Sequence, residues 1–147
     1  MPSDPIRVAD TRAWLGKAET DLRAAAHELT AVPPFAADAV FHAQQAAEKT
    51  MKGLLTWHDA PFRKSHDLAE LGLQCAGLAP LLESLLARAS GLTQYAWKFR
   101  YPGEPEEPSR EEAERAIALA REVYDAIVSL LSQDADFTGG PPHSDSA

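Results

Sequence analysis

Apolar residues recur every three to four positions along most of the chain, which is the spacing of one face of an α-helix. The pattern predicts about five or six helices, three of them long, joined by short links. Such a chain is expected to fold as an all-α, up-and-down antiparallel helical bundle. The predicted helices cover about residues 8–29, 37–57, 65–73, 80–91 and 109–133, with a helical turn that continues to about residue 99.

Residues with capping or helix-breaking chemistry mark the boundaries. Pro33 and the proline after it end the first helix, because proline lacks the amide donor and restricts the residue before it. Ser65 is a suitable N-cap for a short helix, and two glycines, at positions 72 and 77, should end that helix near residue 73. Ser109 and Glu112 have the spacing of a capping box at the start of the last helix.

Aromatic residues alternate with other residues in the segment from Tyr95 to Tyr101, where Lys98 and Arg100 are interleaved. This period of two is compatible with a strand, but an isolated strand would have no partner, so a helical turn is preferred. Aromatic rings interleaved with cations can stack on bases and bind phosphate. Core packing is the commoner use of such rings, and Arg100 and Tyr101 are the residues expected to be exposed.

Composition supports one helical domain. Alanine and leucine dominate, and we expect a single domain over residues 1–133 with a polar, disordered tail over residues 134–147. The chain shows no apolar run long enough to cross a bilayer and no signal peptide, and the lone Cys75 favours a reducing compartment. The expected location is therefore the cytoplasm, with no membrane partner, and Cys75 is expected to be a buried bystander.

Charge is distributed unevenly along the chain. The formal net charge is −8, which argues against a nucleic-acid partner when taken as an average. Residues 41–101, however, carry seven basic and five acidic side chains, while residues 102–147 carry three basic and eleven acidic ones. Because local charge decides what a surface attracts, an anionic ligand at the middle segment remains compatible with the composition.

The middle segment also supplies the candidate site. At 100° per residue, four polar residues of the second predicted helix share one face: His42, Gln45, Lys49 and Lys52. A second polar cluster follows within the next loop and helix start: Arg63, Lys64, His66 and Asp67. The alternative interpretation of the helical stripe is a solvated surface. Two neighbours on the helix have other predicted roles: Gln44 should bond to an adjacent helix, and Glu48 should pair with the lysines.

Several kinds of chemistry have no recognisable motif in this sequence. The glycines form no phosphate-binding loop, and the histidines lack the helical spacing of a metal pair. No nucleophilic triad is evident, since the adjacent His66 and Asp67 have poor geometry for one to orient the other. We therefore predict no catalytic residues, no metal and no cofactor.

Five segments, taken in order, resemble the HEPN domain, the domain named for higher eukaryotes and prokaryotes nucleotide-binding. The resemblance covers roughly Trp14 to Leu131. It rests on WLGKAETDLRAA, FHAQQAAEKTMKGLL, FRKSHDL, YAWKFRYPG and SREEAERAIALAREVYDAI. The resemblance implies an antiparallel helical bundle that usually dimerises and is often encoded beside a minimal nucleotidyltransferase, in a two-component, toxin–antitoxin-like system.

Part of that family consists of metal-independent ribonucleases with an arginine and a histidine separated by four to six residues. No arginine of this chain has a histidine at that separation; Arg23 and Arg63 are each followed too closely by one. The sequence therefore resembles the branch without the ribonuclease motif, and we lean toward a protein that is not an enzyme.

Three hypotheses follow. The first is a dimeric accessory protein that binds a nucleotide or RNA and partners a nucleotidyltransferase. In that hypothesis the phosphate contacts come from four cations, the hydrogen bonds from three side chains, and Tyr101 stacks. The cations are Lys49, Lys52, Arg63 and Arg100, and the hydrogen-bonding groups are His42, Gln45 and His66. The second is a divergent ribonuclease that uses His42 or His66 across a dimer interface. The third is a purely structural dimerisation module.

Overall fold

The computed structural model describes residues 4–103 and 106–135. Within that part, every regular element is a helix and no strand is found, so the predicted all-α bundle is confirmed. The elements in chain order are α1 (Pro5–Glu28), α2 (Ala36–Trp57), α3 (Leu68–Leu78), the 3₁₀ turn η1 (Pro80–Leu82), α4 (Glu83–Ala89), the 3₁₀ turn η2 (Ser90–Ala96) and α5 (Arg110–Leu131).

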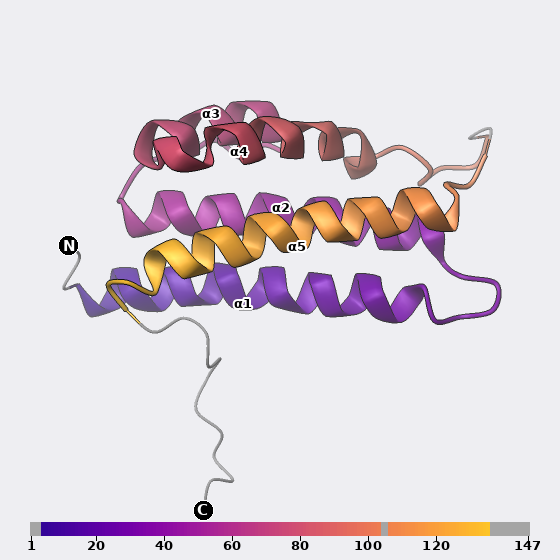
Figure 1. Ribbon diagram of the computed structural model, residues 1–147, viewed down its shortest axis with the longest axis horizontal. Coiled ribbons are helices and arrows are strands. Elements are labelled where there is room, and N and C mark those ends of the chain that lie inside the picture. The colour runs from indigo at the N-terminus through magenta and orange to yellow at the C-terminus, as the bar shows by residue number, and fades with distance from the viewer. Residues whose placement is uncertain (1–3, 104–105, 136–147) are drawn as a thin grey trace, which may run out of the picture.

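Helix α2 occupies the middle of the bundle. It lies antiparallel to α1, with α5 across both, while α3, α4 and η2 form a layer over its other side (Figure 1). Helix α5 runs in the same direction as α2, because the α3–η2 layer brings the chain back to the end at which α2 began (Figure 1). Most of α2 is buried, including Glu48 and Lys52, so this helix contacts neighbours on nearly all sides.

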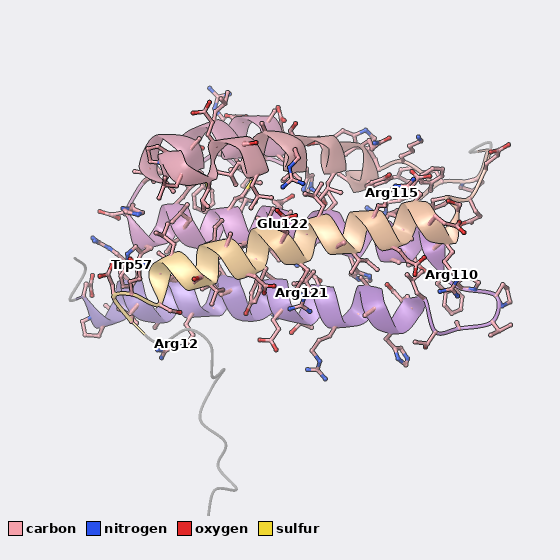
Figure 2. All side chains as sticks on the ribbon, viewed as in Figure 1. Arg12, Trp57, Arg110, Arg115, Arg121 and Glu122 are labelled. Atoms are coloured by element: carbon pink, nitrogen blue, oxygen red, sulfur yellow. The ribbon has the colours of Figure 1, made fainter. Side chains whose placement is uncertain are left out.

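Small residues on α2 let these neighbours approach closely. A Cβ atom at Gly53 would lie 3.1 Å from Leu15 Cδ2 and 3.4 Å from Trp14 Cβ, both on α1. Polar contacts then fix the ends of the bundle. Arg110, labelled in Figure 2, donates from Nη2 to the Leu29 carbonyl at 2.8 Å and joins the start of α5 to the end of α1.

The helix boundaries in the structure agree with the sequence predictions at some helices and differ at others. Ser109 Oγ accepts the Glu112 amide at 3.0 Å, as the capping box predicts. Helix α1 begins at Pro5, a residue suited to the first helical position, and Asp4 Oδ1 caps the helix by accepting the Ile6 amide at 2.9 Å.

The prediction for α3 was wrong at both ends. Its N-cap is Asp67, whose Oδ1 accepts the Ala69 amide at 2.9 Å, whereas Ser65 Oγ accepts the Asp67 amide and forms a turn before the helix. The helix continues through both glycines to Leu78, and Gly72 packs beside Leu86 of α4. The segment near residue 95 is a 3₁₀ turn rather than a strand, as preferred.

The predicted disordered tail covers residues 134–147. Of these, residues 136–147 lie outside the described residues, and α5 ends at Leu131.

Candidate functional site

A buried carboxylate lies at the centre of α2. Glu48 is 4% exposed, and three side chains donate to it. Oε1 accepts from Gln44 Nε2 at 3.1 Å and from His66 Nδ1 at 2.7 Å, and Oε2 accepts from Lys52 Nζ at 2.9 Å. Burial by itself would raise the pKa of Glu48, but the bonds from His66, Lys52 and Gln44 outweigh burial and hold the pKa below its usual range. The carboxylate is therefore ionised at neutral pH.

Lys52 belongs to the interior of this network rather than to an exposed stripe. It is 7% exposed, and its Nζ lies 5.6 Å and 5.7 Å from the ring centres of Trp14 and Phe62. A cation buried between a carboxylate and two aromatic faces has its charge compensated within the protein. Lys52 therefore connects the loop before α3 to α1 and α2 in the interior of the bundle.

The remaining residues of the predicted stripe fall into two groups. His42 Nδ1 bonds to Glu28 Oε1 at 2.8 Å, and Lys49 Nζ bonds to Asp21 Oδ2 at 2.7 Å, so both face α1. Gln45, in contrast, donates to Gln44 Oε1 at 2.7 Å and so joins the Glu48 network. The shared hollow expected for the stripe is thus divided between an α1–α2 seam and the network around Glu48.

Gln44 was expected to bond to a neighbouring helix. Its Nε2 instead donates within α2 to Glu48 and, at 3.3 Å, to the His66 carbonyl in the loop before α3. The expected pairing of Glu48 with Lys52 is confirmed. The expected pairing with Lys49 is not found, because the Lys49 ammonium lies on Asp21 of α1.

Two loops that are distant in sequence meet beside this network. The His66 ring lies 6.4 Å from the Trp97 ring between centroids, and the Leu68 amide donates to Thr93 Oγ1 at 3.0 Å. The residues around this junction are exposed, and most carry a cationic or aromatic side chain. We call them the aromatic–basic surface: Arg63, Lys64, His66, Trp97, Lys98, Arg100 and Tyr101.

Backbone strain helps to shape this surface. Phe99 has φ +70°, a left-handed conformation that is costly for a residue with a side chain. Its ring stacks on Tyr95 at 6.3 Å, and the Tyr95 hydroxyl donates to Glu112 Oε2 at 2.5 Å. Packing against these groups stabilises the turn, which directs Arg100 back toward α2.

Arg100 lies over an aromatic ring. Its Cζ is 3.9 Å from the ring centre of Phe41, and Nη1 donates to the Ala96 carbonyl at 3.1 Å. A guanidinium held in this way retains further N–H donors for an anion such as phosphate. Arg63, by comparison, is exposed, and its Nε lies 3.8 Å from Glu70 Oε1. An exposed ion pair at this distance contributes little to stability.

Sequence reasoning missed three residues that this geometry makes important. Trp97 is 51% exposed although core packing was the expected use of the aromatic segment, and Phe41 was not singled out. The central role of Glu48 could have been inferred from its place four residues from both Gln44 and Lys52. Nothing in the sequence indicated the bond between Glu48 and His66.

Other chemistry is limited in the described part of the chain. No three residues among its histidines, cysteines and acids are grouped to hold a metal ion, and none of its helices has an apolar stretch that could cross a bilayer. Cys75 is fully buried, and burial raises the pKa of its thiol to about 12, as expected for an unreactive thiol.

The fold and this surface define a small all-helical bundle protein with a cationic, aromatic face. The family model for the HEPN domain matches residues 11–131, and the chain belongs to this family. No match was found among curated proteins or among solved structures.

Proposed function

We propose that this protein is a HEPN-type accessory protein that binds a nucleotide or nucleic acid on its aromatic–basic surface. The observation that carries the proposal is the contact between His66 and Trp97, which brings two short cationic segments together. Family membership supports the same conclusion, since HEPN domains are generally related to nucleotides or RNA.

The surface offers the two interactions that single-stranded ligands require. Exposed rings at Trp97 and Tyr101 can stack on any base, and stacking contributes about 1–3 kcal/mol per base. Fixed cations at Arg63, Lys98 and Arg100 can follow the phosphates. His42 and Lys49 are left out of this surface, because their side chains bond to acids of α1. The overall net charge of −8 is compatible with this role, because attraction depends on the local charge.

We further propose that the protein acts as a dimer and partners a minimal nucleotidyltransferase in a two-component, toxin–antitoxin-like system. This part of the proposal rests on the family alone. Copurification from the native host with a protein of nucleotidyltransferase activity is the expected result. Recovery of the chain without such a protein would contradict this part and leave the binding proposal intact.

The binding proposal is tested by titrating ATP, GTP and a short single-stranded RNA against the wild-type protein and two variants, Trp97→Ala and Arg100→Ala. Each variant should bind about tenfold more weakly, because each loses a contact of about 1.4 kcal/mol or more. Arg121→Ala is the matched control, since Arg121 also lies near an aromatic ring, Tyr124 at 5.8 Å, but on α5.

Equal binding by all four proteins would exclude the aromatic–basic surface as the site. The absence of any binding would instead favour a structural dimerisation module.

A second candidate function is supported by the Glu48–His66 bond. A carboxylate that accepts from Nδ1 fixes the imidazole tautomer and leaves Nε2 for proton transfer, the arrangement used in general acid–base catalysis. A divergent ribonuclease of this type would cleave RNA in the presence of a chelator, and His66→Ala would abolish the cleavage. Intact RNA after prolonged incubation with wild-type protein would exclude it.

A further inference from the structure

His66 combines a buried anchor with an exposed ring. Its Nδ1 must be the donor to Glu48 Oε1 at 2.7 Å, because a carboxylate can only accept. The side chain is nevertheless 57% exposed and lies against Trp97, the exposed ring at the centre of the aromatic–basic surface. The second ring nitrogen, Nε2, is therefore the atom that the protein offers to a ligand at this surface.

The charge of the network depends on the protonation of His66. Glu48 and Lys52 are an ion pair, and their charges cancel when the imidazole is neutral. Protonation of His66 gives these three groups a net charge of +1, next to Trp97. Glu48 is bonded to Nδ1, so the protonated Nε2 has no bond to Glu48. A protonated imidazole also turns Nε2 from an acceptor into a donor.

We propose that protonated His66 contacts a phosphate of the bound nucleotide or RNA through Nε2–H, and that Glu48 is the positioning residue that holds the imidazole for this contact. The inference rests on the proposed function, because it assigns a role within the same surface. It predicts that affinity for the ligand rises as pH falls through the range in which histidine gains a proton.

Other charged groups near His66 keep their charge in that range. Lysine and arginine remain protonated and aspartate remains ionised between about pH 5.5 and about pH 8. The groups on its own loop are Arg63, Lys64 and Asp67, those on α2 are Glu48 and Lys52, and those on the segment after η2 are Lys98 and Arg100. A change in affinity across this range that disappears in a His66 variant is thus assigned to His66.

His42 provides a matched control on the same helix. It also bonds through Nδ1 to a glutamate, Glu28 Oε1 at 2.8 Å. Its side chain is only 29% exposed, however, and faces the α1–α2 seam. A variant at His42 removes a histidine–carboxylate pair without removing a group from the aromatic–basic surface.

The experiment measures the dissociation constant of a fluorescent single-stranded RNA with hydroxyl ends, so that no terminal phosphate titrates in the range used. The wild-type protein should bind about tenfold more tightly at about pH 5.5 than at about pH 8. His66→Gln retains an amide that can donate to Glu48, but this amide does not gain a proton in the range of pH used. Whatever its affinity at about pH 8, it should show no tightening at lower pH, whereas His42→Gln should keep the wild-type profile.

Glu48→Gln tests the positioning role. Without the carboxylate, the imidazolium loses its compensating charge, so the rise in affinity should move to lower pH. Because a buried Lys52 could then destabilise the fold, Glu48→Gln/Lys52→Met provides a second variant in which both buried charges are removed. Circular dichroism at each pH shows whether a variant is folded, and a folded variant with the wild-type profile would exclude positioning by Glu48.

The outcomes separate this inference from the proposed function. A wild-type affinity that does not change with pH, or a pH profile that survives in His66→Gln, overturns the inference. If Trp97→Ala still weakens binding in that case, the proposed function stands. The absence of RNA binding by the wild type at every pH overturns both.

Discussion

Glu48 is the centre of the buried hydrogen-bond network in α2. Its carboxylate accepts from Gln44, Lys52 and His66, and so connects the middle of α2 to the loop before α3. A carboxylate this deeply buried is tolerated only because its donors compensate for the loss of water. The same donors fix the orientation of His66, so stability and a candidate ligand contact depend on one side chain.

The asymmetry of the network leads to a stability prediction. Glu48→Met leaves an ammonium, an imidazole and an amide without their acceptor, so it should lower the free energy of unfolding by about 3–5 kcal/mol. Lys52→Met keeps a side chain of similar length between Trp14 and Phe62 and leaves two donors on the carboxylate, and should cost about 1–3 kcal/mol. Urea denaturation measures both.

Lys49→Met is the control for that comparison. Its ion pair with Asp21 is partly exposed, so its loss should cost less than about 1 kcal/mol. Equal costs for Glu48→Met and Lys52→Met would show that the carboxylate is not the centre of the network.

Helical spacing grouped four polar residues of α2 on one face, but only two of them bond to the same neighbouring helix, and the spacing could not identify the partners. His42 and Lys49 lie seven residues apart and do share a face; that face meets Glu28 and Asp21 of α1. Tertiary packing decides which helix covers a polar stripe, and a helical wheel of α2 alone carries no information about that packing. His66 was selected as a site residue, but its anchor on Glu48 comes from eighteen residues away.

At the level of elements, long periodic segments were predictable and short ones were not. Helices α2 and α5 have enough apolar repeats for the periodicity to predict them. The boundaries of α3, in contrast, depend on which of several residues caps the helix. Ser65 and Asp67 can both cap a helix. The Leu68 amide bonds to Thr93 of η2, a tertiary contact that favours a start at Leu68 rather than at His66.

Close packing of α1 against α2 gives a prediction about two glycines. Gly53→Val should destabilise the protein by about 1–3 kcal/mol, because its added atoms would meet Leu15 and Trp14 on α1. Gly16→Ala should stabilise it by about 1 kcal/mol, because nothing lies within 4 Å of the added Cβ and alanine favours helix. Thermal denaturation followed by circular dichroism measures both changes. A neutral Gly53→Val would mean that the two helices are not in close contact.

At the scale of the whole molecule, basic and acidic segments of the chain lie next to one another. The segment after η2 lies at one end of the bundle, near the start of α5 (Figure 1). Cations of residues 41–101 thus meet a neighbouring helix start that is acidic, with Glu111 and Glu112 in its first turn. Glu112 is engaged by Tyr95, while Arg100 is turned toward Phe41 on α2. Attraction of an anion is therefore expected to be local and sensitive to salt.

Salt dependence can count the phosphates that this surface contacts. Each phosphate neutralised on a single strand contributes about −0.7 to the slope of log K against log salt concentration. If the four fixed cations of the aromatic–basic surface all contact RNA, the slope should be about −3, and Arg100→Ala should reduce its magnitude by about 0.7. Fluorescence anisotropy at several potassium chloride concentrations and one constant pH measures the slope. Arg121→Ala should leave the slope unchanged. A slope near zero would contradict electrostatic binding, and an equal reduction by Arg100→Ala and Arg121→Ala would show that net charge, rather than this surface, governs affinity.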